Sequence, residues 1–491
     1  MQTTLRKLLD GAVEAKVSGD LKRSISFLAT DSRRAGPGCL FFALPGARTD
    51  GSHYIEEAID RGAAAVVTEE IRRPHAGVVQ IRVPDARVAM AKIARRFFEN
   101  PDDSLAVFEV AGLRGKSTTA TFMQHLLAAG AGPVGLIGSI AYDLGRRTLP
   151  SVRTTPDAVE LMGLLGEIRD AGAREAVVEI DWMGVRQKSA YGLRTKIVVV
   201  TNIAGETLEN GESMDSRRDL VRELLGGNTA AAPEVAVINV DDPEGRRLAS
   251  NLPAGIRIVT FGRSPAADVR AETVATYPDS NRLTLAWPEG TAEMDVPVAG
   301  EHNVAGFLAA AATCYAAGRD PAGFAASLTA FPGVPGRMEP IDRGQAFRVF
   351  VDHGHTPETL AAVLDSLRRT TPGKVLVVFG CGGGRNRSAR AVATRTIQER
   401  ADFFWATADN TRGEPLERIF SDMKTGVIDE NGIAFVDDRR VAIDRAFQEA
   451  GPGDCVLLAG KGHEAFLEMG HTLLPFDDRL VAADLLALPR I

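Results

Sequence analysis

The sequence predicts an α/β protein of three domains, with mainly parallel sheets covered by helices on both faces. The chain has 491 residues, and at roughly 150 residues per domain this length corresponds to about three domains. Short apolar runs recur at the spacing of strand–helix units, which is typical of parallel sheets. Many of the 49 glycines follow these runs, where the turns of α/β domains lie.

The strands and helices expected in each domain follow from these runs. In the first domain, residues 1–103, we expect a strand within 38–45, a helix over 54–62 and a strand over 63–67, with 101–103 as a linker. The central domain, residues 104–334, is expected to have strands at 105–110, 176–180, 197–201, 235–240 and 256–261, and a β-rich patch at 266–298. The last domain, residues 335–491, is expected to have strands at 347–352, 374–379, 403–407 and 455–459.

Composition and charge exclude several function classes. The chain has 57 Lys and Arg against 64 Asp and Glu, a net charge of −7, which argues against a general nucleic-acid binder and a polybasic membrane anchor. The first residues lack the apolar core of a signal peptide, and no apolar run is long enough to span a membrane. We therefore expect a cytoplasmic protein.

The cysteines point to neither disulfides nor zinc. Cys39, Cys314, Cys381 and Cys455 are far apart and form no CxxC pair. Cys381 lies in a glycine-rich loop, where a nucleophile is conceivable, but the sequence indicates no partner for it. We interpret Cys381 as a structural thiol.

A glycine-rich turn in the central domain is the first candidate site. The expected strand at 105–110 is followed by Gly112-Leu-Arg-Gly115-Lys116-Ser117 and then by a helix. Glycines let backbone N–H groups approach phosphates, and a helix N-terminus adds partial positive charge. Lys116 would reach the outer phosphates and Ser117 would hold Mg²⁺. The strict GxxxxGK pattern fails because residue 110 is Val, so an ordinary strand–helix turn is the alternative.

Two further patterns accompany this turn. Glu179 and Asp181 are two residues apart near the end of an expected strand, so they would share one face and form a Mg²⁺ site, unless one is a solvated strand end. In the last domain, four polar or glycine-rich segments follow strands, at 352–357, 380–387, 409–412 and 460–464. Because the carboxyl ends of parallel strands lie at one edge, we expect these segments to converge on a ligand.

Taken together, these segments resemble the Mur ligase family over nearly the whole chain and in the same order. Residues 112–118 are similar to the family's GTNGKTT loop, 336–339 to GRME, and 352–357 to DYAHTP. Residues 380–390 resemble GCGGDRDRGKR, 409–412 resemble DNPR, and 460–464 are GKGHE unchanged. Residues 30–33 and 154–156 resemble the family's uridine-nucleotide and muramoyl-peptide contacts.

The resemblance implies the family's three-domain architecture and an ATP-dependent ligase that forms an amide bond through an acyl phosphate. The implied substrates are a UDP-linked muramoyl dipeptide and an amino acid such as meso-diaminopimelate, with ATP and Mg²⁺ as cofactors, no nucleic-acid or membrane partner, and a monomeric chain. The catalytic candidates are Lys116, Glu179, Arg337 and His355. The implied ATP-binding residues are Gly112, Gly115, Lys116, Ser117, Thr118, Asn303, Arg337 and Asp352. The implied substrate-binding residues are Ser32, Arg33, Thr154, Thr155, Arg390, Asp409, Asn410, Arg412, Gly460 and Glu464, and the implied metal ligands are Ser117, Glu179 and Asp181.

The chain departs from the family's pattern mainly in the central domain. Thr207 stands where the family has a metal-binding histidine, and Val221 stands where it has a carbamylated lysine. No lysine occurs between Lys196 and Lys374. Elsewhere the pattern is changed at three further positions, namely Gly306 in FNxxN, Gly384 in GCGGD and Thr411 in DNPR.

These departures leave three alternatives for function. In the first, Asp181, Glu206 or Glu209 rebuilds the second metal site and the family's cell-wall reaction is kept. In the second, the chain ligates a different acid and amine in a specialised pathway. In the third, it binds ligands without joining them. The retained Arg390, Arg412 and Glu464 argue against a bare nucleotide-binding switch, which needs no amino-acid pocket.

Overall fold

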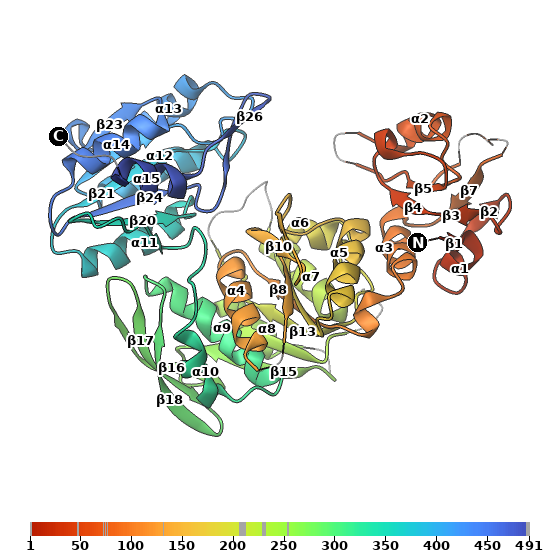
Figure 1. The fold of residues 1–491 in the computed structure, drawn as a ribbon, viewed down its shortest axis with the longest axis horizontal. Helices are drawn as coiled ribbons and strands as arrows, with labels where there is room; N and C mark the ends of the chain where they lie inside the picture. The colour runs from red at the N-terminus through yellow and green to blue at the C-terminus, as the bar shows by residue number, and fades with distance from the viewer. Residues whose placement is uncertain are drawn as a thin grey trace.

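The computed structural model describes residues 2–487 apart from 47–48, 72, 74, 76, 131, 206–212, 228–231 and 253–254. Within these residues three large sheets follow one another along the chain (Figure 1). The first and third sheets lie at opposite ends of the molecule and the central sheet lies between them. Most strands pair in parallel and helices cover the sheets, so the predicted α/β, three-domain architecture is confirmed.

The first sheet has the order β2-β7-β6-β5-β4, and only β2 is antiparallel to its neighbour. Its strands are β2 (Lys16–Ser18), β4 (Phe27–Ala29), β5 (Cys39–Phe42), β6 (Ala65–Thr68) and β7 (Val79–Arg82). The helices of this part are α1 (Leu5–Leu9), α2 (Ile55–Asp60) and α3 (Ala86–Phe97), and a small pair joins β1 (Thr3–Thr4) to β3 (Ser24–Ile25). The two expected strands and the expected helix are all present.

The central sheet has the order β11-β10-β9-β12-β8-β13-β14-β15-β16-β17-β18. Its parallel strands are β8 (Ala106–Ala111), β9 (Val134–Ile137), β12 (Glu175–Ile180), β13 (Thr195–Val200), β14 (Val235–Asn239) and β15 (Arg257–Gly262). The expected β-rich patch is an edge that β16 (Val269–Thr276), β17 (Asn281–Trp287) and β18 (Gly290–Val296) add to the same sheet. The parallel strand β9 and the short antiparallel strands β10 (Ala141–Asp143) and β11 (Thr148–Pro150) were not expected.

Two apolar layers hold helices against this sheet. One layer contains residues of α4 (Lys116–Ala128) and α9 (His302–Ala316), and the other contains residues of α5 (Ala158–Asp170), α6 (Trp182–Arg186) and α7 (Met214–Arg222). Two shorter helices, α8 (Pro243–Ala249) and α10 (Phe324–Leu328), complete this part. Because β8 and β13 are covered on both faces, their side chains are almost all apolar, as parallel strands require.

The third sheet has the order β19-β20-β24-β21-β22-β23, parallel from β20 onwards. Its strands are β19 (Glu339–Pro340), β20 (Arg348–Asp352), β21 (Val375–Phe379), β22 (Phe403–Thr407), β23 (Ile433–Val436) and β24 (Cys455–Ala459). Its helices are α11 (Pro357–Thr370), α12 (Ser388–Gln398), α13 (Leu416–Lys424), α14 (Arg439–Glu449) and α15 (Asp478–Ala487). A hairpin of β25 (Phe466–Met469) and β26 (Thr472–Pro475) stands beside it.

The four strands expected in the third sheet are confirmed, whereas β23 was not expected. All four cysteines are buried and unpaired, as the sequence predicts. Among the described residues, no helix has both the length and the apolar character that crossing a membrane requires.

Candidate active site

A cleft of about 750 Å³ lies where the central sheet faces the third domain. One wall consists of residues that follow the carboxyl ends of β8, β9, β12, β13 and β14, including 112–119, Ser139, Asp181 and Asn202. The opposite wall comes from the third domain and includes Arg337, residues 352–356 and Arg385. Ligand sites of this volume are large enough for a nucleotide together with a second small molecule.

The glycine-rich turn has the shape of a phosphate loop. Gly112 and Gly115 have φ angles of 141° and 81°, a region that favours glycine. A Cβ atom at Gly112 would lie 2.1 Å from Thr201 Oγ1, so a larger residue does not fit. Gly115 caps the N-terminus of α4 and a Cβ there would meet no atom within 4 Å, so the turn is open on that side. These are the features that let an anion approach helix N–H groups.

Two polar side chains fix this loop. Asn202 Oδ1 accepts hydrogen bonds from the backbone N–H groups of Leu113 and Arg114, at 3.1 Å each. Lys116 Nζ donates to the carbonyl oxygen of Gly112 at 2.8 Å, so its ammonium group lies over the loop. The loop is therefore tied to β13, and a lysine charge is held where outer phosphates would bind.

Glu179 lies buried directly behind the wall of the cleft, where it contacts two residues that line it, Ser117 and Ser139. It accepts hydrogen bonds from Ser117 Oγ at 3.1 Å and from the N–H and hydroxyl of Ser139 at 3.2 and 3.1 Å. Burial raises the pKa of Glu179, and the nearby charges of Lys116 and Arg337 oppose that shift. A Cβ at Gly138 would lie 2.2 Å from Glu179 Oε1, so that glycine makes room for the carboxylate. The hydroxyl and carboxylate oxygens of Ser117 and Glu179 fit Mg²⁺, which prefers oxygen ligands.

The structure places Asp181 directly after β12 instead of on the strand, and its pairing with Glu179 at Mg²⁺ stays a prediction. β12 ends at Ile180, and Asp181 caps α6 by accepting a hydrogen bond from the N–H of Gly184 at 2.6 Å. Asp181 still lines the cleft. The hydroxyl of Thr155 donates to the carbonyl of Glu179 at 3.0 Å and accepts from the N–H of Asp181 at 2.9 Å, so Thr155 fastens the strand end.

The position of the family's carbamylated lysine holds no polar group. Val221 lies in α7 with no exposed surface and packs in the apolar layer with Leu220 and Leu224. Arg217, one turn earlier on α7, lines the cleft and donates to the carbonyls of Ile203 and Gly205 at 3.4 and 3.2 Å. A hydrocarbon side chain and a cation do not fit a second Mg²⁺ at this place.

Other candidates for a second metal site are only partly described. Glu206, Thr207 and Glu209 lie outside the described residues. Within the rest of the chain, no group of three or more His, Cys, Asp and Glu side chains is placed to hold a metal ion.

Asn303 and Thr118 lie together on the other side of the loop. Thr118 Oγ1 donates to Asn303 Oδ1 at 3.4 Å, and Asn303 Nδ2 donates to the carbonyl of Ala299 at 2.8 Å. A Cβ at Gly306 would lie 2.7 Å from Thr118 Cγ2. The close packing of α9 on α4 therefore explains why glycine stands at 306.

Arg337 joins the third domain to the phosphate loop. Its Nη2 lies 3.5 Å from Ser117 Oγ, and its Nη1 lies 3.3 Å from Nδ1 of His463. His463 in turn contacts the carbonyl oxygen of Ser139 through Nε2 at 2.9 Å. Burial lowers the pKa of Arg337, and burial together with the Arg337 charge lowers the pKa of His463 to about 4.

Asp352 fixes the backbone beside this contact. Its carboxylate accepts hydrogen bonds from the N–H groups of Met338 and Gly354, at 2.8 and 2.6 Å. Asp352 is buried and lines the cleft, so one predicted nucleotide contact holds both the segment that carries Arg337 and the segment that carries His355.

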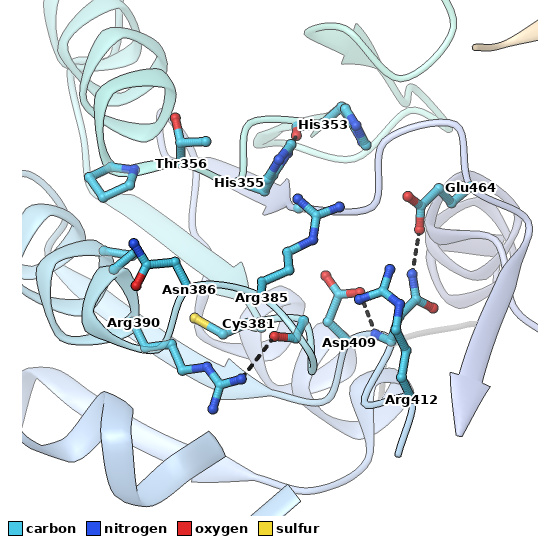
Figure 2. A pocket seen from close by; sticks show the side chains of 17 residues that line it. His353, His355, Thr356, Cys381, Arg385, Asn386, Arg390, Asp409, Arg412 and Glu464 are labelled. Atoms are coloured by element: carbon cyan, nitrogen blue, oxygen red, sulfur yellow. Dashed lines mark hydrogen bonds between the residues drawn. The ribbon is translucent and has the colours of Figure 1, made fainter. Parts of the chain in front are cut away.

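A second pocket lies in the third domain, and it confirms the predicted convergence of four segments (Figure 2). Residues that follow β20, β21, β22 and β24 line it, and they include His355, Cys381, Asp409 and Gly460. His353, His355, Thr356 and Arg385 line both this pocket and the cleft. Figure 2 shows Arg385 extending across the pocket toward His355.

The charged groups of this pocket are held by short contacts. Asn410 Nδ2 donates to Glu464 Oε2 at 2.7 Å. Arg412 has a φ angle of 52°, donates to the carbonyl of Gly383 at 2.7 Å and pairs with Glu468 at 3.2 Å. Burial raises the pKa of Cys381 to about 12, so its thiol stays protonated at neutral pH, in keeping with a structural role.

Arg390 is engaged by acids of its own domain. Its side chain is 2% exposed and contacts Glu414 at 2.6 Å and Asp422 at 2.9 Å. Arg390 also donates to the carbonyl of Gly382 at 3.2 Å, which places it under the glycine loop of the pocket. The guanidinium therefore supports the pocket wall and has two carboxylates as its immediate partners.

Thr154 lines the cleft, whereas Ser32 and Arg33 lie in neither cavity. Thr154 Oγ1 is 3.0 Å from Ser139 Oγ. In the first domain, Ser32 Oγ donates to Glu57 at 2.8 Å and Arg33 pairs with Asp31 at 2.7 Å. The structure thus places most of the predicted residues at two adjoining cavities. Glu179 and Thr155 are buried behind the cleft wall, and Ser32 and Arg33 lie apart.

Among the residues that the sequence prediction missed are Asn202, Ser139 and Arg385, which line the cleft, and His463, which contacts Ser139. Asn202 and His463 stand inside motifs that carry the resemblance, so the motifs themselves were the signal for them. Arg385 lies in the motif at 380–390 too, but the prediction assigned substrate binding to Arg390 of that motif. Ser139 had no signal, because a Gly-Ser pair after a short strand is an ordinary turn.

Comparison with known families covers most of the chain. Residues 24–98 match the Mur ligase family catalytic domain, residues 110–314 the Mur ligase middle domain, and residues 336–462 the Mur ligase glutamate ligase domain. UDP-N-acetylmuramoyl-L-alanyl-D-glutamate–2,6-diaminopimelate ligase of Geobacter metallireducens is 36% identical over 485 residues, covering 95% of this chain and 94% of that protein. The protein of the same name from Gloeobacter violaceus is 37% identical over 468 residues, covering 95% and 94%.

Solved structures agree with these sequence matches. A structure titled with the same ligase name has a TM-score of 0.70 and 28% identity, and the match covers 99% of both chains. The MurF ligase of Thermotoga maritima, solved with ADP, shares the fold at a TM-score of 0.62 and 18% identity over 94% of this chain and 96% of its own. Because relatives above 35% identity span nearly the whole chain and all three domain models match in order, the chain belongs to the Mur ligase family.

Proposed function

We propose that the chain is an ATP-dependent ligase that joins the amine of 2,6-diaminopimelate to a carboxylate of UDP-N-acetylmuramoyl-L-alanyl-D-glutamate. These are the substrates in the names of its relatives. One observation carries the proposal, namely that His355 and Arg385 line both the cleft and the pocket of the third domain. A carboxylate beside the phosphate loop and an amine in the pocket would therefore meet at a shared boundary.

The proposed chemistry has two balanced steps. A carboxylate oxygen of the acid attacks the γ-phosphorus of ATP, which breaks the bond to the bridging oxygen and releases ADP. The amine nitrogen then attacks the acyl carbon, inorganic phosphate leaves, and one amine proton is lost. Lys116 and Arg337 neutralise charge on the transferred group, while Ser117 and Glu179 would hold Mg²⁺.

His355 is the proposed acceptor of the amine proton. Its Nδ1 lies 2.9 Å from the carbonyl oxygen of His353, which fixes the proton on Nδ1 and makes Nε2 the basic nitrogen. Asp409, Asn410, Arg412, Gly460 and Glu464 would bind the amino acid, with Arg390 behind them. Thr154 would contact the muramoyl peptide, and Ser32 and Arg33 the uridine end.

We also propose the domain boundaries 1–103, 104–334 and 335–491. The first boundary is supported by a turn at Pro101–Asp103 between α3 and β8, and the second by the extended segment between α10 and β19. We also propose a monomer as the acting form, as the family resemblance implies.

Val221 favours a second candidate, a family member that binds these ligands or related ones without this ligation. A fully buried valine at the position of the carbamylated lysine removes one ligand of the family's second metal ion. Loss of such an ion without replacement lowers the rate strongly, because it helps to neutralise the transferred phosphoryl group.

Phosphate release with a product mass separates these candidates. The chain is incubated with ATP and Mg²⁺, and with UDP-N-acetylmuramoyl-L-alanyl-D-glutamate and meso-diaminopimelate added singly or together. Phosphate release that needs both substrates, with the tripeptide mass, supports the proposal. ATP binding without product from this pair contradicts the cell-wall reaction and favours the second candidate or another pair of substrates.

A further inference from the structure

Behind the pocket of the third domain lies an ion pair that takes no part in the cavities. Arg439 begins α14 and Asp478 begins α15, and both side chains have 0% exposure. Arg439 Nε and Nη2 donate to the two carboxylate oxygens of Asp478 at 2.8 and 2.6 Å. The desolvation of two such charges commonly equals or exceeds their attraction, so stability alone does not account for the pair.

The rest of the guanidinium holds the ends of two strands. Arg439 Nη2 also donates to the carbonyl of Ala459, the last residue of β24, at 3.0 Å. Arg439 Nη1 donates to the carbonyl of Ala408, which directly follows β22, at 3.4 Å. These strands are not neighbours, because β21 lies between them in the sheet. One side chain therefore ties two strand ends across a third strand.

The residues after these two carbonyls form the pocket wall. Asp409 follows Ala408 and Gly460 follows Ala459, and both line the pocket. Gly460 has a φ angle of 105°, and a Cβ there would lie 3.1 Å from Asp409 Oδ2, so the two loops touch. Asn410 and Glu464 continue the contact through their 2.7 Å hydrogen bond. The spacing of the loops thus determines where an amino acid could sit.

The start of α15 holds the same wall at a second point. Arg479 follows Asp478 and pairs with Asp477 at 2.6 Å. Arg479 Nη2 also lies 3.5 Å from the carbonyl oxygen of His463, inside the loop that carries Glu464. Asp478 is therefore fixed in a segment that contacts both the ion pair and the loop.

We propose that Arg439 and Asp478 are positioning residues for amine binding, which set the distance between the loops that begin at Asp409 and Gly460. This inference rests on the proposed function and adds residues that touch neither substrate nor cofactor. It requires that the pair acts on the binding of the amine, since Asp409 and Gly460 line only the pocket, and that no effect passes through His463 of the same loop to Arg337 and the binding of ATP.

The test compares two double variants that remove one ion pair each. Arg439→Met/Asp478→Leu replaces the buried pair by apolar side chains of similar size, a change that proteins often tolerate. Arg440→Met/Asp484→Leu is the matched control, because this exposed pair joins the same two helices at 2.5 Å. The single variant Arg439→Lys keeps the charge but cannot reach both carbonyls, and it replaces the double variant if that variant does not fold.

The expected result is a split between substrates. In the folded Arg439→Met/Asp478→Leu variant, KM for meso-diaminopimelate rises by about tenfold to a hundredfold, as displacements of about 1 Å in a site do. KM for ATP stays at the wild-type value, and the control variant behaves as wild type for both substrates. An unchanged KM for the amine in the folded variant overturns the inference.

The inference can also be judged if the proposed function fails. If the wild-type protein forms no product, the proposed function is contradicted. Hydrogen exchange then tests whether the ion pair holds the two loops in place. Backbone N–H groups of residues 408–412 and 460–464 should exchange faster in Arg439→Met/Asp478→Leu than in the control variant. Equal exchange in the two variants overturns the inference.

Discussion

The carboxylate of Glu179 is buried and hydrogen-bonded in the protein without a ligand. It is 1% exposed, and two serines donate to it, Ser117 in the first turn of α4 and Ser139 after β9. A buried carboxylate without a cation is disfavoured, which is why burial raises its pKa. A divalent cation bound there would reverse that shift.

Glu179→Gln tests this role. Glutamine keeps the shape and the contacts with both serines but removes the charge, so we expect the Mg²⁺ concentration for half-maximal phosphate release to rise by about tenfold or more. The measurement is a Mg²⁺ titration at saturating ATP. Glu109→Gln is the control, because Glu109 is a buried carboxyl of the neighbouring strand β8 that lies outside the cleft. Equal Mg²⁺ requirements for the two variants would remove Glu179 from the metal site.

At the residue scale, the sequence predicted groups that lie close to a strand end within one motif. Lys116, Ser117 and Glu179 are of this kind: the first two line the cleft, and Glu179 lies behind it and accepts a hydrogen bond from Ser117. The contact between His463 and Ser139 joins residues 324 positions apart, so nothing local in the sequence indicates it. Asp181 was expected on the strand but caps α6, because an aspartate after a strand can equally begin a helix.

Two glycines inside helices of the central domain differ in the space that the surrounding packing leaves for a side chain. Gly306 lies inside α9, where a Cβ would come within 2.7 Å of Thr118 Cγ2 on α4. Gly166 lies inside α5, and a Cβ there would meet no atom within 4 Å. Gly306 therefore permits the close packing of α9 on α4, whereas Gly166 only lowers the stability of α5 without a packing reason.

Alanine substitutions at the two glycines should have opposite effects on stability. Gly306→Ala should lower the free energy of unfolding by about 1–3 kcal/mol, because Thr118 or a helix must move. Gly166→Ala should raise it by about 0.5–1 kcal/mol, since alanine favours the helix and fits the space. Scanning calorimetry of the two variants gives the comparison. A stabilising Gly306→Ala would show that the packing of α4 on α9 is not the reason for the glycine.

At the scale of elements, long apolar strands were predictable and short antiparallel ones were not. β13 and β21 are buried runs of Val, Ile and Leu between turns, and each was predicted to within two residues. β10 and β11 are three residues each, and their pairing depends on the neighbouring strand β9 more than on their own composition. The family resemblance supplied the order of the domains, while periodicity supplied the strands.

The contact between the central and third domains includes groups that respond to pH. Burial and the Arg337 charge lower the pKa of His463 to about 4, and burial lowers the pKa of His353 well below its usual range. At a pH well above about 6.5, both rings are neutral in the folded and in the unfolded chain. As the pH falls from about 6.5 toward about 4, an opened or unfolded chain takes up a proton on His463 that the closed protein does not.

Mild acid should therefore weaken the closed arrangement. For His463 alone the loss amounts to roughly 2 kcal/mol between about pH 7.5 and about pH 5. The measurement is the melting temperature at the two pH values for wild type and for His463→Gln. Glutamine can still donate to the carbonyl of Ser139 but does not titrate, so this variant should show a smaller decrease. An equal decrease in both proteins would mean that His463 does not titrate in this range.

The order of strands in the third sheet has a consequence for how the protein is made. β24 is the last of the parallel strands in the chain, yet it lies between β20 and β21. Until the ribosome has added the residues from Cys455 onwards, β24 is missing between β20 and β21. Each of these two strands then has one edge without a hydrogen-bonding partner. The first two domains have all their sheet strands by Val296 and can fold earlier, since chains grow slowly compared with domain folding. The pocket of the third domain is thus completed only when Gly460 to Glu464 emerge. A chain whose translation stops before them would have the glycine-rich loop of the central domain but an incomplete pocket opposite it.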